Sequence, residues 1–314
     1  MWSRSVLILG GLGDIAQSMS DVISNRLPET KVHLADARQA HAADPAILLL
    51  PPAEKESYPE ELRALIERFN PDVIIPTNEG EIHRLAASDI HPLVASRALL
   101  ESRENILHFG DKLLTYEWGI RNGIPAVPTR VASLASEVGF PLIIKPRSGS
   151  GGKGQTILQN SAQLEGLPQF LSDSYVVQPY QATAQEFTCI AARNGSSVHT
   201  LVLERTLRHG RSNWIRVADD ATVLDVAYRT TALLAPKNSI NFQFLLSNDE
   251  LGLIDVNPRF SSTVAMRDAL GFSDLVWTLN RAFNQGAMTY ERPRPGAVVE
   301  WADDEGRALL VSHT

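Results

Sequence analysis

The chain has 314 residues, of which 44% are hydrophobic and 21% charged, and its formal net charge is −7 at pH 7. This length exceeds one compact core and predicts two or three packed domains. The acidic balance argues against a nucleic-acid partner, which normally binds a basic face. The scattered charges argue against a polybasic membrane patch. The single cysteine, Cys189, excludes an intrachain disulfide and a metal site built from several cysteines.

No segment approaches the roughly 20 apolar residues of a membrane-spanning helix. The N-terminal apolar run is too short and too interrupted by glycine for a signal peptide. A cytoplasmic protein is therefore expected.

The first third of the chain alternates strand-like apolar runs with segments of helical periodicity. Two helices are predicted, at 14–27 and 58–69, and four strands are predicted at 5–11, 31–36, 46–52 and 71–75. The last strand runs into a polar loop, PTNEGE. This βαβ rhythm predicts a doubly wound parallel sheet up to about residue 97.

A glycine fingerprint lies at the end of the first predicted strand. Gly11, Gly13 and Ala16 fit G-x-G-x-x-A, and Asp36 closes the next apolar run. This is the outline of a dinucleotide-binding motif. A lone fingerprint is weak, however, so these residues either bind NAD or serve only the fold.

The remainder of the chain begins with a helical zone, DKLLTYEWGIRNGIPAVPT, in which Gly123 and Pro125 end the helix. Short strands follow around a glycine-rich loop, and the pair at 186–206 is expected to turn at Asn194-Gly195. A helix at 223–234 precedes a strand pair, INFQFLL and LGLIDVNP, that turns at Asn248-Asp249. An amphipathic helix at 270–286 leads to a tail that adds either an edge strand or a dimer contact.

Three oxygen-bearing side chains converge in the predicted strand pair. Asp255 and Asn257 are two residues apart on one strand and therefore share a face. Gln243 lies on the strand expected to pair with it. Such a set suits Mg²⁺, and Arg259 is placed to neutralise a transferring phosphoryl group. The alternative is an ordinary strand end, with Asp and Asn capping a turn before Pro258.

The loop KPRSGSGGKG follows an apolar strand that delivers Lys145. Its glycines allow backbone N–H groups to approach phosphate closely. It is not a Walker A loop, because Arg147 occupies a position that needs glycine and no Ser or Thr follows Lys153. The alternative is a flexible hairpin tip.

Two further segments say little alone. A strand ending in a polar hinge at 177–180 precedes Glu186, which is suited to a ribose or else is an exposed acid. Lys112 near a helix start is either a phosphate ligand or a solvated charge.

In this order, the four segments resemble the ATP-grasp superfamily, most closely the synthetase units of carbamoyl phosphate synthetase large subunits and small amino-acid ligases of similar build. The most specific stretch is NFQFLLSNDELGLIDVNPRFSSTVAMRDALGFS. The resemblance implies an α/β chain, α+β in its C-terminal part, with the ATP-grasp fold. It implies a Rossmann-like pre-ATP-grasp domain at 1–97, a lid subdomain at 98–180 and a C-terminal subdomain with the metal site at 181–314.

The resemblance also implies roles for individual residues. Gln243, Asp255 and Asn257 would bind Mg²⁺, or Mn²⁺ in its place. Arg259 and Lys145 would be catalytic, with Arg259 on the γ-phosphate or acyl phosphate. The residues implied to hold ATP are Lys112, Lys145, Ser148, Gly151, Gly152, Val177, Gln178, Pro179, Tyr180 and Glu186. Those expected to meet the substrate are Glu79, Arg205 and Arg259.

Several positions differ from the pattern of the ATP-grasp family and limit which activity can be predicted. Asp255 stands where Glu is commoner, and Pro179 in the hinge has no N–H to donate. The family's histidine-containing substrate loop has no clear match in ERTLRHGRSNW, where Arg205, Arg208 and Arg211 stand instead, and this puts carbamoyl phosphate synthesis in doubt. In this family the opening sheet does not bind dinucleotide, so Gly11, Gly13 and Asp36 are interpreted as fold residues.

The predicted function is an ADP-forming, ATP- and Mg²⁺-dependent carboxylate–amine ligase that acts through an acyl phosphate on an amino acid or related small carboxylate. Its expected partners are small molecules, with no nucleic acid and no membrane, and a homodimer is compatible. One alternative is a catalytically idle ATP-binding module, which would bind ATP without forming ADP. The other is a nicotinamide-dependent oxidoreductase, which would bind NADH rather than ATP.

Overall fold

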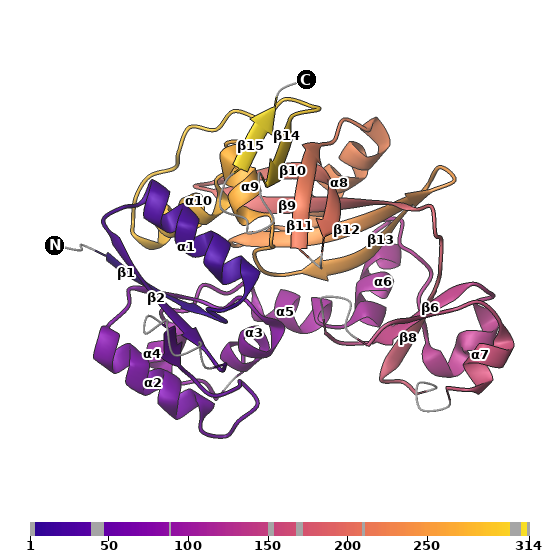
Figure 1. Cartoon of the computed structure of the whole chain (residues 1–314), viewed down its shortest axis with the longest axis horizontal. Helices are drawn as coiled ribbons and strands as arrows, with labels where there is room; N and C mark the ends of the chain where they lie inside the picture. Colours follow the sequence, from indigo (N-terminus) through magenta and orange to yellow (C-terminus); the bar gives the residue numbers. More distant parts are fainter. Residues whose placement is uncertain are drawn as a thin grey trace.

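The computed structural model places three β-sheets in chain order, joined by helices (Figure 1). Within the described part of the chain, no helix has the length and hydropathy of a transmembrane span. The residues that the structure describes are 4–38, 47–87, 89–149, 154–167, 172–208, 211–301 and 309–312.

The N-terminal sheet has four parallel strands in the order β3-β2-β1-β4. Both faces are covered, because alternate side chains of the central strand pack against α1 (Asp14–Arg26) on one side and α2 (Tyr58–Phe69) on the other. A strand buried on both faces needs a continuous apolar run, which VLIL supplies. The doubly wound parallel sheet is therefore confirmed. The strands are β1 (Arg4–Leu9), β2 (Thr30–Asp36), β3 (Ile47–Leu49) and β4 (Val73–Ile75).

The segment after β4 is more helical than the sequence predicted. The expected polar loop ends at Asn78, whose Oδ1 accepts the Glu81 backbone N–H at 2.9 Å and caps a helix, α3 (Glu79–Leu85). Three more helices follow: α4 (Pro92–Ala95), α5 (Arg103–Phe109) and α6 (Lys112–Arg121). The segment after α6 bridges to the C-terminal sheet through Ala126 and Leu253.

The second sheet is antiparallel, with the order β5-β8-β6-β7, and encloses a small core of its own with α7 (Ser161–Glu165). It projects from the rest of the molecule at the lower right of Figure 1. Its strands are β5 (Arg130–Val131), β6 (Leu142–Pro146), β7 (Thr156–Leu158) and β8 (Tyr175–Pro179), and a 3-10 turn (Ala132–Glu137) follows β5.

The third sheet has seven antiparallel strands in the order β13-β12-β9-β10-β11-β14-β15. The C-terminal tail supplies the last two strands at one end of the sheet, of which β15 is the edge strand, and this is one of the two roles expected for it. The strands are β9 (Gln185–Asn194), β10 (Ser197–Arg208), β11 (Arg211–Val217), β12 (Ser239–Ser247), β13 (Glu250–Asn257), β14 (Val298–Trp301) and β15 (Leu309–Ser312). The helices are α8 (Ala221–Leu234), α9 (Val264–Ala269) and α10 (Asp274–Ala282).

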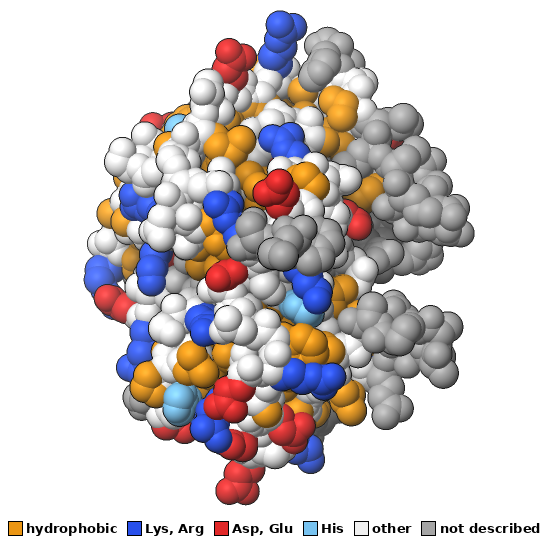
Figure 2. Space-filling view, turned by 90° about the vertical axis from the view of Figure 1, so that its left-hand side faces the viewer, with side chains coloured by type: hydrophobic (Ala, Val, Ile, Leu, Met, Phe, Trp, Pro, Cys, Tyr) orange, Lys and Arg blue, Asp and Glu red, His pale blue; other side chains and the backbone are white. Residues whose placement is uncertain are grey.

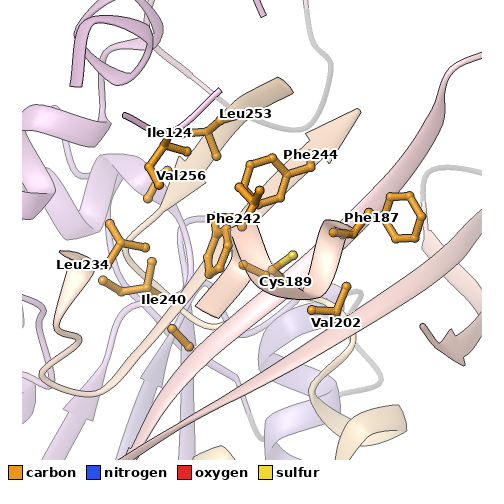
Figure 3. Close-up of a cluster of buried hydrophobic side chains, with 14 of the residues drawn as sticks. Ile124, Phe187, Cys189, Val202, Leu234, Ile240, Phe242, Phe244, Leu253 and Val256 are labelled. Carbon is orange, nitrogen blue, oxygen red and sulfur yellow. The ribbon is translucent and has the colours of Figure 1, made fainter. Parts of the chain in front are cut away.

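The main core lies between one face of this sheet, α8 and the segment after α6. Figure 3 shows the aromatic rings of Phe242 and Phe244 from β12 beside Cys189 of β9, with Ile124 against Leu253. Because burial raises the pKa of the Cys189 thiol, this cysteine is an inert core residue. The core fixes β9, β12 and β13 side by side.

The two predicted hairpin turns differ in accuracy. Asn248 and Asp249 both have left-handed backbone, with φ of 49° and 62°, as a two-residue turn of this type requires. The β9–β10 turn lies one residue later than expected, at Gly195 and Ser196.

The three sheets fall within the predicted segments 1–97, 98–180 and 181–314. Their folding as separate domains stays a prediction.

Candidate ATP and metal site

The three predicted metal ligands lie together on β12 and β13. Gln243 is directly opposite Asp255 in the antiparallel register, so their side chains share a face of the sheet. Asn257 lies on the same face, and its Nδ2 donates to Asp255 Oδ2 at 2.9 Å. A register shift follows Gln243 and bends the strand at this point. The three side chains therefore share one face of the sheet, as their spacing in the sequence predicted.

The neighbouring strands add an ion pair to this face. Glu186 of β9 accepts a hydrogen bond from Gln243 Nε2 at 2.7 Å. The same carboxylate oxygen accepts from Arg205 of β10, from Nε at 2.9 Å and from Nη2 at 2.7 Å. The Arg205 side chain is only 13% exposed. The Arg205 guanidinium therefore holds the Glu186 carboxylate in place, and the charge of Arg205 is already paired within the chain.

Lys145 brings a positive charge to Asp255 and Glu186 from the second sheet, which we call the lid sheet because it lies in the predicted lid subdomain. Lys145 lies on β6, where desolvation lowers the pKa of its ammonium to about 8. Asp255 and Glu186 oppose that shift of the pKa, whereas the nearby charge of Lys112 adds to it. A lysine whose pKa is shifted by burial and by nearby charged side chains is typical of a functional site. The region around Lys145, Asp255 and Glu186 is therefore a candidate site.

Lys112 is fixed at the start of α6, as the sequence predicted. Its Nζ donates to the carbonyl of Gly149, and its backbone N–H donates to the Arg147 carbonyl at 3.0 Å. Asp111 caps the helix and accepts from Arg147 Nε at 2.7 Å. These bonds anchor the beginning of the glycine-rich loop to the helix.

The glycine-rich loop is described only at its two ends. Ser148 is exposed at its beginning. Gly151 and Gly152, which were expected to cover the phosphates, lie outside the described residues.

The predicted adenine hinge forms the end of β8. Val177 is buried in the lid core, and Gln178 is 4% exposed with its Nε2 donating to Thr129 Oγ1 at 2.8 Å. The Tyr180 N–H donates to the Pro141 carbonyl at 2.9 Å, and Pro179 has no N–H. The predicted hinge thus ends β8, and both its Tyr180 N–H and its Gln178 Nε2 already donate to the chain itself rather than to a base.

Arg259 follows β13 and faces a hollow between the C-terminal sheet and the N-terminal helices. Its Nη1 donates to the Phe260 carbonyl at 2.9 Å, whereas its Nε is buried and makes no hydrogen bond to any described residue. Burial lowers the pKa of its guanidinium, and the charges of Glu79 and Asp255 counter that effect. The predicted substrate residue Glu79 is thus near the predicted phosphate residue.

Some residues that line this hollow were not predicted from the sequence. The hollow is lined by His83 of α3, by apolar side chains of α5 and by the chain from Val256 to Arg259. A Cβ on Gly110 would lie 2.5 Å from His83 Cε1, so glycine is what admits the imidazole here. A histidine inside a short, weakly periodic helix gives no sequence signal for such a position.

The N-terminal fingerprint serves the fold, as interpreted. A Cβ on Gly11 would lie 2.8 Å from Leu34 Cβ, so glycine permits close packing of the loop on β2. Asp36 is nearly buried and accepts from the Leu12 N–H at 2.9 Å and from the guanidinium of Arg38 at 3.0 Å. The acidic residue that would bind a ribose in a dinucleotide site is thus satisfied by its own chain.

The donor set fits a hard cation. One carboxylate and two side-chain amides supply oxygen, and Mg²⁺ commonly takes few protein ligands together with phosphates and water. No cluster of three or more His, Cys, Asp or Glu side chains suited to a metal occurs within the described ranges. A metal held here would therefore depend on the amide oxygens of Gln243 and Asn257 as well as on Asp255.

This arrangement of a lid sheet, two lysines and an oxygen cluster coincides with a known domain. A model of the ATP-grasp domain family matches residues 109–263. The chain contains an ATP-grasp domain. The match spans both lysines, the hinge, the oxygen cluster and Arg259.

Known relatives of the ATP-grasp domain in this chain include large enzymes. Pyruvate carboxylase of Staphylococcus aureus is 24% identical over 266 residues, which cover 73% of this chain and 22% of that protein. Carbamoyl phosphate synthase large chain of Campylobacter jejuni is 25% identical over 232 residues, which cover 65% of this chain and 21% of that protein. The chain thus spans about a fifth of the length of these relatives.

The fold likeness extends beyond the ATP-grasp domain. Carboxyaminoimidazole ribonucleotide synthase of Aspergillus clavatus, whose structure was determined in complex with ATP, superposes with a TM-score of 0.72. The sequences are 19% identical, and the match covers 96% of this chain and 82% of that one. The three-sheet architecture with an N-terminal Rossmann-like sheet is therefore confirmed as an ATP-grasp fold.

Proposed function

We propose that this protein is an ATP- and Mg²⁺-dependent carboxylate–amine ligase that forms ADP and acts through an acyl phosphate. The observation that carries the proposal is the approach of Lys145, from the lid sheet, to Asp255 and Glu186 of the third sheet. Gln243 and Asn257 are hydrogen-bonded to these two carboxylates. A cation from one sheet and oxygen ligands from the other are what the phosphates and metal of bound ATP require.

The residues divide the work of phosphoryl transfer between them. Lys112 and Lys145 bind the phosphates, and Arg259 contacts the γ-phosphate. Gln243, Asp255 and Asn257 would hold Mg²⁺, which would supply positive charge to the phosphate oxygens. The substrate carboxylate attacks the γ-phosphorus and ADP leaves, so that an acyl phosphate forms. An amine then attacks the acyl carbon, inorganic phosphate leaves, and the amine gives up a proton.

The carboxylate substrate is proposed to bind beside Arg259, where the hollow has a volume of about 10 Å³, room for about one water molecule, and would have to widen to admit it. Glu79 and Arg259 carry opposite charges there, and the wall is largely apolar. A small acid with an amino group, such as an amino acid, complements this charge pair. Arg205 was also predicted to meet substrate, and its ion pair with Glu186 makes its role the support of that carboxylate.

The face of the molecule in Figure 2 shows basic and acidic side chains intermixed. Nucleic acid binds to clustered basic charge, and the described side chains on this face do not form such a cluster.

The proposal is tested by measuring ADP formation over a matrix of carboxylates and amines with ATP and Mg²⁺. At least one acid–amine pair is expected to stimulate ADP release, and Asp255→Ala and Asn257→Ala should abolish the stimulated rate. Glu250→Ala, an exposed acid at the other end of β13, is the matched control and should retain it. Tight ATP binding without ADP release across the whole matrix would instead identify an idle ATP-binding module.

A further inference from the structure

The largest fully buried side chain in the described part of the chain is an arginine of α9. Arg267 and its partner Asp274 have side chains that are 0% and 1% exposed. Arginine is almost never fully buried unless its charge is paired, because removing it from water is costly. Such a residue must be fully hydrogen-bonded, and its partners show what it holds.

Arg267 connects three segments of the chain. Its Nε and Nη2 each donate to the Asp274 carboxylate at 2.8 Å. Its Nη1 donates to Ser261 Oγ at 2.9 Å and to Thr263 Oγ1 at 2.8 Å. Asp274 in turn accepts from Ser239 Oγ, at the start of β12, at 2.6 Å. We call these five side chains the Arg267 network.

The segment that the Arg267 network holds carries Arg259. Residues 258–263 have no regular secondary structure. Backbone hydrogen bonds involve Arg259, Ser261 and Thr263, and side-chain contacts add to them in fixing the segment. Ser261 is two residues after Arg259. Ser239 and Arg259 both line a second small hollow, separate from the one beside Glu79. The Arg259 guanidinium makes one hydrogen bond within the described residues, to the carbonyl of Phe260, and the Arg259 backbone N–H donates to the Asn257 carbonyl at 2.7 Å.

We propose that Arg267 is a positioning residue that fixes the 258–263 segment and thereby directs the Arg259 guanidinium toward the γ-phosphate. The inference rests on the proposed function, because that function supplies the γ-phosphate. A buried ion pair contributes little net stability when compared with well-packed apolar residues of similar volume. The Arg267 network therefore acts by selecting one conformation of the segment rather than by making the fold more stable.

The test compares the affinities of a triphosphate analogue, AMP-PNP, and of ADP, each with Mg²⁺. The double variant Arg267→Met/Asp274→Leu replaces the ion pair with apolar side chains. It should lose about tenfold or more of the preference for AMP-PNP over ADP, the effect of one misplaced charge-assisted hydrogen bond. Its affinity for ADP should stay within about threefold of the wild type. A merely structural residue would leave this preference unchanged.

A second set of variants separates action through Arg259 from an independent effect. Arg259→Met should lose the same preference, and adding it to the double variant should cost nothing further. Additive losses, or an unchanged preference in the double variant, would overturn the inference. Thr278→Val, a buried hydroxyl of α10 with no hydrogen bond to described residues, is the matched control and should behave as wild type.

If the double variant fails to fold, Arg267→Lys decides the question. Lysine keeps a positive charge beside Asp274. Its ammonium cannot bond Asp274, Ser261 and Thr263 in the geometry that the guanidinium allows. A partial loss of the AMP-PNP preference is expected, and an unchanged preference would contradict the inference. If wild-type protein binds both nucleotides equally, Arg259 makes no contact specific to the γ-phosphate and the inference is overturned. If wild-type protein binds neither nucleotide, the proposed function fails instead.

Discussion

The titration of Lys145 gives a prediction that can be worked through in numbers. Desolvation lowers the pKa of its ammonium to about 8 in the protein without nucleotide. Phosphate binding requires the charged form, so the free protein must already carry this proton or take it up on binding. Affinity for ATP should therefore fall as the pH rises through 8.

The expected size follows from the charged fraction of the lysine. With a pKa of about 8, it is roughly 90% charged at pH 7 and roughly 10% charged at pH 9, so the affinity should fall about tenfold between them. A lysine with an ordinary pKa of about 10.4 would change by only a few per cent over the same range. Between pH 7 and 9 the two cases are easily distinguished.

The measurement is isothermal titration of AMP-PNP into protein at pH 7, 8 and 9 with saturating Mg²⁺, in buffers of different ionisation enthalpy. About half a proton should be taken up per nucleotide at pH 8. Lys145→Met should bind more weakly at pH 7 and lose both the pH dependence and the proton uptake. Lys31→Met, an exposed lysine on β2, should behave as wild type. A wild-type affinity that is constant from pH 7 to 9 would refute the reasoning.

Two predictions concern the N-terminal sheet. Burial raises the pKa of Glu81 to about 8, so the folded protein keeps a proton that the unfolded chain loses above about pH 4.5. The free energy of unfolding should then fall as pH rises toward 8, by up to about 1.4 kcal/mol per pH unit, and Glu81→Gln should remove that slope in urea denaturation. Gly11→Ala forces a Cβ to within 2.8 Å of Leu34 Cβ and should cost about 1–3 kcal/mol, measured as a lower Tm. Gly286→Ala, with nothing within 4 Å, is its control, and equal Tm values would contradict the packing argument.

Local chemistry explains which parts of the fold could be predicted. The Asn248-Asp249 turn and the doubly wound sheet follow from turn residues and from apolar runs, which act over short distances. Helix α3 was missed because seven residues are too few for a periodic pattern. Its signal was the spacing of Asn78 and Glu81, which form a capping pair.

Register explains why the ion pair of the site was not predicted. The β9–β10 turn begins one residue later than expected, and this places Arg205 opposite Glu186. A turn at Asn194-Gly195 would instead have placed Leu203 opposite Glu186. A small error in turn position thus changes every cross-strand partner.

The oxygen cluster and the two lysines were predicted, whereas their supports were not. Asp255 and Asn257 share a face because of strand periodicity, which the sequence displays. The Arg267–Asp274 pair depends on how α9 and α10 pack, and no short-range pattern specifies that contact. The only sequence signal was an arginine among the apolar residues of VAMRDAL.

The central claim is that Gln243, Asp255 and Asn257 hold a divalent cation together with ATP. Electron paramagnetic resonance of Mn²⁺ in the presence of AMP-PNP tests it most directly. The account predicts that wild-type protein and Glu250→Ala bind the Mn²⁺–nucleotide complex alike, whereas Asp255→Ala and Asn257→Ala each weaken Mn²⁺ binding at least about tenfold. Wild-type Mn²⁺ binding in both of those variants would contradict the claim.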